Sequence, residues 1–400
     1  MMDNWKVLNL GDISDIKRGL PSQDLNYVDS DVEGVRLIRI NDFKSDTPKY
    51  IKESEKTKKL VVSKGDILIA GTGATAGISF LVEELWDGLP FSYNAPRIKV
   101  NKGNSSQFVY YVLNSEKIKI QQNKLFTGNA QPFLDTRAIA SFKIPIPPLP
   151  EQQKIADILS TVDAKIDIID LQITETQELK KGLMQRLLTK GIGHTEFKDS
   201  PLGRIPKSWE VVRLNQVGDI VTGTTPKTSV REYYTENGVL WASPADLGKQ
   251  KYIESTNKQL TNLGFQQTRK LPPKSIMVTC IGSTIGKIGM TNSNMSTNQQ
   301  INSIVCNESN CPEFYYYLIE KIAVYIKSLA GTQAVPLLNK TDFSAINVVN
   351  PPMQEQKIIS EILKTLDEKT EILSEKKETY QVLKQGLMQQ LLTGKIRVKV

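Results

Sequence analysis

The sequence predicts an α+β protein in which two tandem, pseudo-symmetric domains are separated by an antiparallel coiled coil of two long helices. Segments of the first half recur about 204 residues later. Each copy begins with short β-branched runs broken by Gly, Pro, Asn and Asp, which is typical of a strand-rich domain. Each copy ends with apolar residues at four-three spacing, which is typical of a coiled-coil helix.

The internal repeat extends over nearly the whole chain. WKVLNLGDISDIKRG at 5–19 matches WEVVRLNQVGDIVTG at 209–223, and GLMQRLLTKGI at 182–192 matches GLMQQLLTGKI at 386–396. The strand and glycine turn GDILIAGTGATAG at 65–77 corresponds to KSIMVTCIGSTIG at 274–286, where the offset of 209 implies a five-residue insertion. The chain is therefore an internal tandem duplication.

The repeat divides the chain into five segments. The polar linker between the copies contains Gly, Pro and the lone His194, to which the sequence assigns no role. The predicted segments are a first domain at 1–150, a first helix at 151–190, the linker at 191–208, a second domain at 209–354 and a second helix at 355–395.

Each predicted helix starts after a proline pair, in PPLPEQQKIADIL at 147–159 and PPMQEQKIISEIL at 351–363. Glu151 and Glu355 lie in the first turns, where a carboxylate complements the helix dipole. A helix of this length with one apolar stripe is not stable alone. Because a globular domain lies between the helices, we expect antiparallel pairing; the alternative is that both helices are core elements of one large domain. The predicted coiled-coil seam comprises Ile155, Leu159, Val162, Ile166, Ile169, Ile173, Leu183, Leu187, Ile359, Leu363, Leu366, Leu373, Leu387 and Leu391. Leu179 and Leu383 continue the apolar pattern at equivalent positions of the two helices.

The positive charge lies mainly in the two predicted domains. The chain has 51 basic and 43 acidic side chains, for a net charge of +8. Residues 1–150 carry 20 basic and 17 acidic side chains, and residues 191–354 carry 16 and 12, whereas the predicted helices are close to neutral. This distribution favours a polyanionic partner.

Composition argues against several classes of protein. The apolar runs are too short for a transmembrane helix, and the first residues lack the features of a signal peptide. Three cysteines and one histidine can form neither a disulfide framework nor a zinc site, and they provide no nucleophile with an adjacent base. We therefore expect a cytoplasmic protein without a structural metal.

Two motifs suggest enzymes at first sight. Asn350–Met353, NPPM, resembles the Asn/Asp-Pro-Pro-aromatic loop of amino-methyltransferases, but Met353 replaces the aromatic ring that would stack a flipped base. We interpret it as the start of a helix. GTGATAG at 71–77 lacks the lysine and hydroxyl of a P-loop, so we interpret it as a tight connection that brings backbone close to a ligand.

Two mildly basic domains held at a fixed separation suit the recognition of two DNA half-sites. Because the two copies differ most in their middle parts, the half-sites are expected to differ in sequence. Side chains able to bond bases or phosphates are the candidates. In the first copy they are Lys17, Arg18, Arg39, Asn41, Thr72, Thr75, Asn94 and Arg97, and in the second Thr222, Thr224, Lys227, Ser243, Thr284, Lys287, Asn298, Gln299 and Gln300.

The whole arrangement resembles the specificity (S) subunit of type I restriction-modification systems. The resemblance is carried by the doubled Pro-Pro-x-x-Glu-Gln helix start, by GRIPKSWEVVRL before the second domain, and by the repeated GLMQ motif. It covers essentially the whole chain.

The resemblance implies a function and a set of partners. The domains near 1–150 and 205–350 would each recognise one half of an asymmetric, interrupted target in double-stranded DNA. The helices would act as a spacer and dock two modification (M) subunits, which methylate adenine with S-adenosylmethionine. Restriction (R) subunits would use ATP with Mg to translocate and cleave DNA. The S subunit itself would have no active site, no cofactor and no membrane association.

Two rival functions remain at this point. A self-sufficient adenine methyltransferase needs a cofactor-binding glycine motif and an intact aromatic residue in the Pro-Pro loop, and neither is present. A coiled-coil protein-interaction scaffold, or an orphan DNA-binding subunit without nuclease partners, would need no such motif.

Overall fold

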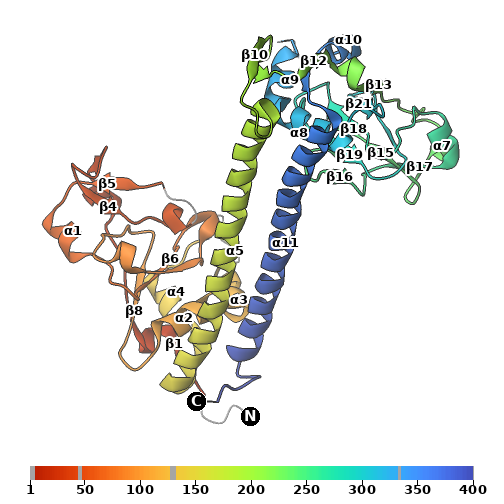
Figure 1. Ribbon diagram of the computed structural model, residues 1–400. Coiled ribbons are helices and arrows are strands. Elements are labelled where there is room, and N and C mark those ends of the chain that lie inside the picture. Colours follow the sequence, from red (N-terminus) through yellow and green to blue (C-terminus); the bar gives the residue numbers. More distant parts are fainter. Residues whose placement is uncertain (1–4, 44–46, 127–131, 332–334, 400) are drawn as a thin grey trace. The chain divides into compact units, whose positions relative to one another are not determined.

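The computed structural model describes residues 5–43, 47–126, 132–331 and 335–399. The chain forms two compact units, Met1–Asp170 with Glu375–Val400, and Leu171–Ser374. The boundaries between the units lie inside two long helices, α5 (Leu149–Lys190) and α11 (Met353–Leu391). Both helices are labelled in Figure 1. Each unit therefore consists of one domain together with parts of both helices.

The domain of the first unit contains three small sheets, in the strand orders β2-β8-β6-β7, β3-β5-β4 and β1-β9, all paired antiparallel. Its strands are β1 (Lys6–Asn9), β2 (Ser14–Lys17), β3 (Tyr27–Val28), β4 (Val35–Leu37), β5 (Lys49–Ile51), β6 (Ile67–Ile69), β7 (Ser79–Leu81), β8 (Arg97–Val100) and β9 (Lys143–Ile146). Its helices are α1 (Glu55–Lys59), α2 (Ser106–Leu113), α3 (Glu116–Phe126) and α4 (Thr136–Ala140), with single 3-10 turns at Leu10–Asp12, Ser22–Asp24, Ile40–Phe43, Gly73–Thr75 and Glu84–Trp86.

The domain of the second unit repeats this plan, with the orders β13-β21-β18-β19-β16, β14-β17-β15-β20 and β12-β22. Its strands are β12 (Glu210–Arg213), β13 (Gly218–Thr222), β14 (Tyr234–Thr235), β15 (Val239–Ala242), β16 (Tyr252–Ile253), β17 (Gln259–Leu260), β18 (Ile276–Thr279), β19 (Ile288–Thr291), β20 (Ser296–Thr297), β21 (Ile301–Cys306) and β22 (Asn347–Asn350). Its helices are α6 (Leu214–Val217), α7 (Asn262–Gln266), α8 (Pro312–Lys321), α9 (Ala323–Leu329) and α10 (Lys340–Ser344), with a 3-10 turn at Arg231–Tyr233.

The predicted duplication is visible in the topology. The order β2-β8-β6-β7 corresponds to β13-β21-β18-β19, and β3-β5-β4 corresponds to β14-β17-β15. The predicted linker is more ordered than its composition suggested, because β10 (Phe197–Ser200) and β11 (Gly203–Pro206) form a hairpin within it. The α+β class and the two-copy plan predicted from the sequence are confirmed.

The segments of α5 and α11 run antiparallel within each unit. In the first unit Asp163 pairs with Lys384 at 2.5 Å, and Asp170 pairs with Lys377 at 2.6 Å. Residue numbers therefore increase along one helix in the direction in which they decrease along the other. All fourteen residues of the predicted seam are buried or half-buried, whereas Leu179 and Leu383 are exposed.

The ends of the helices also complete the cores of the domains. In the first unit, Ile155 and Leu159 of α5 and Leu391 of α11 belong to the same buried cluster as strand residues such as Ile67 and Ile98. In the second unit, Leu187, Ile359 and Leu363 join the corresponding cluster. Since burial of apolar surface is the main stabilising term in folding, each domain is stabilised by both helices.

The repeated glutamate at the start of each helix holds a tryptophan from the first strand region of its domain. Trp5 donates its indole N–H to Glu151 at 3.2 Å, and Trp209 donates to Glu355 at 2.9 Å. Glu355 also lies 2.8 Å from Nε2 of His194. The histidine to which the sequence assigned no role therefore contacts the start of α11.

The repeated glutamine joins the helix start to the domain. Gln152 accepts a hydrogen bond from the backbone N–H of Ser105 at 2.8 Å and donates to the carbonyl of Pro147 at 2.9 Å. Gln356 makes the same pair of bonds, with the N–H of Cys311 at 2.8 Å and the carbonyl of Pro351 at 2.9 Å. This duplicated contact explains the spacing of the Pro-Pro-x-x-Glu-Gln motif.

Candidate nucleic-acid interface

Four segments of the first domain converge in what we call the first loop cluster, defined as residues 17–20, 71–77, 92–97 and 132–134. Backbone hydrogen bonds hold them together. Gly71 donates to the carbonyl of Asn94 at 2.8 Å, Leu134 donates to Gly71 at 2.8 Å, and Tyr93 donates to Leu20 at 2.8 Å. The glycine turn that the sequence could not assign to a phosphate site is thus the centre of this cluster.

The second domain contains the corresponding second loop cluster, defined as residues 222–225, 280–287, 296–300 and 336–338. Cys280 donates to the carbonyl of Gln300 at 2.8 Å, Leu338 donates to Cys280 at 2.9 Å, and Thr224 donates to Thr297 at 2.8 Å. The bonds of Gly71 and Leu134 in the first cluster are equivalent to those of Cys280 and Leu338 in the second, and the bond from Thr224 to Thr297 is equivalent to one that Leu20 donates to Phe91 at 2.8 Å. The side chains of the two clusters differ at most positions.

Most of the predicted DNA-binding residues fall into these clusters, although they were chosen from separate parts of the sequence. The first cluster holds Lys17, Arg18, Thr72, Thr75, Asn94 and Arg97, and the second holds Thr222, Thr224, Thr284, Lys287, Asn298, Gln299 and Gln300. Arg39, Asn41, Lys227 and Ser243 lie outside both.

Two of the predicted arginines of the first domain have carboxylate partners inside the protein. Arg39 forms an ion pair with the buried Asp42 at 3.1 Å. Arg97 lies 3.8 Å from the carboxylate of Asp66 and donates to the carbonyl of Val61 at 2.9 Å. Burial is the main cause that raises the pKa of Asp66, and the positive charge of Arg97 opposes it. Both arginines thus have a structural role in the free protein.

Arg18 differs from them, because no carboxylate among the described residues forms an ion pair with it. Its guanidinium donates to the carbonyls of Tyr93 at 3.3 Å and Leu134 at 3.2 Å. The guanidinium carbon lies 4.3 Å from the ring centroid of Tyr93 and 5.1 Å from that of Phe133. Arg18 is therefore a cation in contact with two aromatic rings.

The predicted residues of the second domain are mostly neutral and are partly bonded to one another. Thr222 donates to the amide oxygen of Asn302 at 2.7 Å, and Asn298 donates to that of Gln300 at 2.9 Å. Asn298 is buried, whereas Gln299 is exposed. Ser243 lies outside the cluster and donates to the carboxylate of Asp246 at 2.7 Å.

A tyrosine, an aspartate and a lysine meet where the first domain contacts the two helices. The hydroxyl of Tyr111 on α2 donates to Asp163 of α5 at 2.8 Å, and the same carboxylate lies 2.5 Å from Nζ of Lys384 on α11. Burial and the bond to Asp163 raise the pKa of Tyr111, which keeps it a donor. We call these three residues the first latch.

The second latch consists of Tyr317, Asp367 and Lys180 in the second unit. The hydroxyl of Tyr317 donates to Asp367 at 2.6 Å, and Nζ of Lys180 lies 2.7 Å from the same carboxylate. A cavity of about 520 Å³ lies at the first latch and one of about 840 Å³ at the second. The repeat therefore duplicates this surface as well as the loop clusters.

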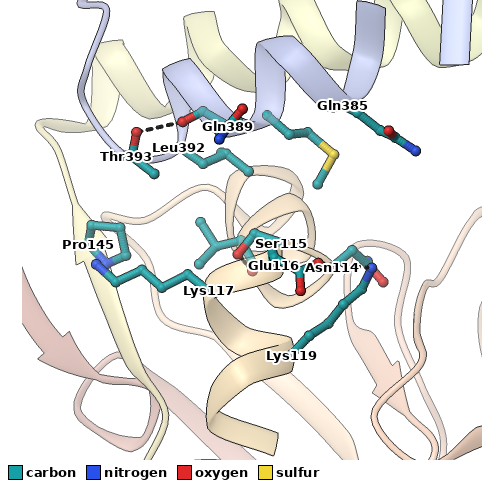
Figure 2. A pocket seen from close by; sticks show the side chains of 12 residues that line it. Asn114, Ser115, Glu116, Lys117, Lys119, Pro145, Gln385, Gln389, Leu392 and Thr393 are labelled. Carbon is teal, nitrogen blue, oxygen red and sulfur yellow. Dashed lines mark hydrogen bonds and ion pairs between the residues drawn. The ribbon is translucent and has the colours of Figure 1, made fainter. Parts of the chain in front are cut away.

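A narrower groove of about 360 Å³ lies between α3 and the end of α11 in the first unit. Figure 2 shows Lys117 and Lys119 on one side of it and Gln389 and Thr393 on the other, with Thr393 bonded to the carbonyl of Gln389 at 2.6 Å. Its α11 side is part of the repeated GLMQ segment. The groove carries charges of both signs, since Glu116 also lines it.

Neither a metal site nor a membrane span is present in the described part of the chain. No group of three or more His, Cys, Asp and Glu side chains among those residues could hold a metal ion. None of the helices in the described ranges is both long and apolar enough to cross a bilayer. The three cysteines are free.

The duplicated architecture has a counterpart among known proteins. The pattern described as "Type I restriction modification DNA specificity domain" matches residues 2–179 and again residues 206–381. The chain belongs to the family of type I restriction-modification specificity subunits. The MjaVIII specificity subunit of Methanocaldococcus jannaschii is 32% identical over 416 residues, which cover 99% of this chain and 94% of that protein.

Further relatives agree with this assignment. The HindI specificity subunit of Haemophilus influenzae is 25% identical over 465 residues, which cover 99% of this chain and 100% of that protein. The crystal structure of a type I S subunit from M. genitalium is similar in fold, with a TM-score of 0.65 and 16% identity over 97% of this chain and 96% of that one. As a specificity subunit, the chain serves DNA target recognition and is non-catalytic.

The motif that resembled a methyltransferase loop has a structural role in this specificity subunit. Asn350 ends β22 and Met353 begins α11, so the proline pair lies at the start of a helix. The side-chain amide of Asn350 accepts hydrogen bonds from Tyr315 and Gln356, both at 2.9 Å. The interpretation of this motif as a helix start is confirmed.

The sequence missed several residues of the loop clusters. Tyr93 and Phe133 of the first cluster and Leu337 of the second are 42%, 45% and 47% exposed. Phe133 bridges to Thr72, and Leu337, which lies 204 residues further on, bridges to Ile281. The one sequence signal for Phe133 and Leu337 is their equivalent position in the repeat, because an exposed apolar residue in a loop follows no periodic pattern.

Proposed function

We propose that this specificity subunit recognises an asymmetric, interrupted DNA sequence through one loop cluster for each half-site. The observation that carries the proposal is that the two clusters share a set of equivalent backbone bonds and have different side chains. The same backbone plan would present both clusters to DNA in the same way. Different side chains would select different bases.

The target-recognition domains would be residues 1–150 and 209–354, with residues 151–190 and 355–395 forming the spacer. The positive charge of the two domains supports contact with phosphates. We take the clusters as the regions of base contact, with exposed Lys17, Lys287 and Gln299 as the residues best placed to reach DNA.

The partners would be two modification subunits, which supply S-adenosylmethionine-dependent methylation, and restriction subunits, which use ATP with Mg. A duplicated surface supports two copies of one partner. Ile168 and Leu383 of the first unit are 49% and 47% exposed, and their equivalents Ile372 and Leu179 of the second unit are 63% and 52% exposed. Such a complex would act in the cytoplasm, where its DNA substrate lies.

Substitutions in each cluster test the proposal. The chain is assembled with its modification subunits, and the complex selects sequences from a randomised DNA library. We expect Gln299→Ala to relax the preference in one half-site and leave the other unchanged. Lys17→Ala and Lys287→Ala each remove a positive charge that we assign to phosphate contact, so they are expected to weaken binding at all sequences. A change in both half-sites from the single substitution of Gln299 would contradict the proposal.

A further inference from the structure

We propose that Arg18, Tyr93 and Phe133, which we call the aromatic platform, form a base-reading contact in the half-site recognised by the first domain. The inference rests on the proposed function and names residues that read the DNA. Leu337 is the corresponding contact in the second domain. Tyr93, Phe133 and Leu337 were not among the candidates that the sequence offered.

The first argument is that no carboxylate in the described part of the chain forms an ion pair with Arg18. Arg39 and Arg97, the other candidate arginines of the first domain, are paired with Asp42 and Asp66. Among the described residues Arg18 makes two hydrogen bonds, both to carbonyl groups. A guanidinium has five N–H donors, and two of those of Arg18 are used by groups in the described part of the chain. A cation with no carboxylate partner among those residues suits a guanine edge or a phosphate, both of which accept hydrogen bonds.

The second argument is that the platform holds Arg18 in place before DNA binds. The guanidinium lies over the ring of Tyr93 at 4.3 Å and over that of Phe133 at 5.1 Å. The backbone on either side is fixed as well, because Tyr93 donates to Leu20 at 2.8 Å and Leu134 donates to Gly71 at 2.8 Å. A long side chain that is already ordered loses less conformational entropy on binding. Such rigidity favours a directional contact with one base over a mobile contact with phosphate.

The third argument is the exposure of the rings. Tyr93 and Phe133 are both more than two-fifths exposed, although they are large and aromatic. The backbone of Phe133 is bridged to Thr72, which fixes the place in the cluster from which the ring projects. Exposed rings beside an arginine can contact a thymine methyl group or the face of a base. The pair of rings would therefore add shape selection to the hydrogen bonds of Arg18.

The second domain has a different set of groups at the equivalent places. Thr222 is the equivalent of Arg18. Gln299 is the equivalent of Tyr93, because Ile38 pairs with Phe91 as Ala242 pairs with Thr297. Neither Thr222 nor Gln299 has a charge or an aromatic ring. Leu337 alone keeps the exposed apolar character of its counterpart, and it bridges to Ile281 as Phe133 bridges to Thr72. We therefore expect the two half-sites to differ at the base pair that this position contacts.

The test uses the assembled complex of the full chain with its modification subunits and a randomised DNA library. Arg18→Ala and Phe133→Ala are expected to reduce discrimination at the same or adjacent base pairs of one half-site by about tenfold or more. The other half-site should keep its preference. Leu337→Ala is expected to relax the other half-site by a smaller factor, because it removes only an apolar contact.

Matched controls separate these effects from general surface changes. Leu85→Ala removes an exposed apolar side chain from the first domain, and Val324→Ala removes one from the second. Both are expected to leave discrimination unchanged at every base pair. Circular dichroism and thermal unfolding are measured for each variant to check that the fold is retained.

The outcomes are distinguishable. If Arg18→Ala lowers affinity equally for all sequences, Arg18 contacts phosphate only and the base-reading inference is wrong. If all variants bind with unchanged preference, the aromatic platform does not touch DNA, although the proposed function stands. If the unaltered complex selects no sequence from the library, the proposed function itself fails.

Discussion

The helix-start motif shows how single residues connect the domains to the helices. From the sequence, Glu151 and Glu355 were expected only to complement the helix dipole. In the structure they also accept hydrogen bonds from Trp5 and Trp209, each 146 residues distant along the chain. No local pattern could have revealed these partners, because the fold alone brings the tryptophans to the helix starts.

Gln152 offers a direct test of this motif, because it is 1% exposed and bonded to Ser105 and Pro147. Gln152→Ala would leave a buried N–H and a buried carbonyl without partners. We expect the free energy of unfolding of the first unit to fall by about 2–4 kcal/mol. Gln153→Ala, a neighbouring exposed position, should change it by less than about 0.5 kcal/mol. Urea titration followed by tryptophan fluorescence measures both; equal effects would contradict the role assigned to Gln152.

Two cysteines, the buried Cys280 and the half-buried Cys306, give a prediction about pH. Burial raises the pKa of the Cys280 thiol to about 11 and that of Cys306 to about 12. Because the thiolate is the reactive form, a raised pKa lowers reactivity at pH 8 and shifts its increase to higher pH. We expect slow alkylation of both residues by iodoacetamide in the folded protein and rapid alkylation in urea. Mass spectrometry of the labelled peptides measures the alkylation of each residue. Rapid alkylation of either thiol in the folded protein at pH 8 would contradict the prediction.

At the scale of elements, the two long helices were the most predictable feature. Their apolar spacing and proline starts placed them at 151–190 and 355–395, and the structure has them at Leu149–Lys190 and Met353–Leu391. The latches were not predictable, because each helix carries many charged residues. Only the pairing register decides that Asp163 meets Lys384 and that Asp367 meets Lys180.

The loop clusters could be predicted only in part. Polar residues next to strand ends suggested contacts, and most of them do lie in the clusters. Arg39 and Ser243 are residue types that commonly contact DNA, so the sequence suggested them as candidates. It could not show that they are bonded to Asp42 and Asp246 within the protein. It also gave no reason to consider an exposed Phe133.

The exposed apolar residues of the helices test the docking proposal. Leu179→Asp and Leu383→Asp should each leave the seam intact, because these side chains face solvent. We expect each change alone to remove one of two bound modification subunits, and both together to remove two. Native mass spectrometry measures the stoichiometry.

Val382→Glu is the matched control for this docking test. Val382 is 63% exposed, and its counterpart in the first copy is Glu178. An apolar side chain at this position is therefore not part of the surface that the two copies share. The change should leave two modification subunits bound. Retention of both partners by the double variant of Leu179 and Leu383 would contradict docking at these residues.

At the scale of the whole molecule, the repeat predicted two copies of one plan, and the structure has them. It did not predict that each compact unit takes residues from both helices, with boundaries at Asp170 and at Ser374. Coiled-coil periodicity continues through those positions, so no sequence signal marks them. The helices therefore contribute residues to both units. The spacer role proposed for them predicts that their length sets the distance between the half-sites.

A matched insertion tests this consequence. Seven residues of heptad sequence are added to each helix, after Leu171 and after Glu375, which are equivalent in the repeat. A heptad keeps the apolar seam facing its partner, and both latches remain outside the insertion. At 1.5 Å per residue and 3.4 Å per base pair, we expect the spacer to lengthen by about 3 base pairs. Library selection should show both half-sites unchanged; an unaltered spacer would reject the role of the helices.

The central claim is that this chain alone determines which DNA sequence the complex recognises. Single-molecule methylome sequencing of a host with the modification gene, with and without the gene for this chain, tests it most directly. We predict that one interrupted, asymmetric N6-methyladenine motif disappears when the chain is deleted and returns when it is restored. Persistence of every methylated motif in its absence, with active modification subunit present, would contradict the account.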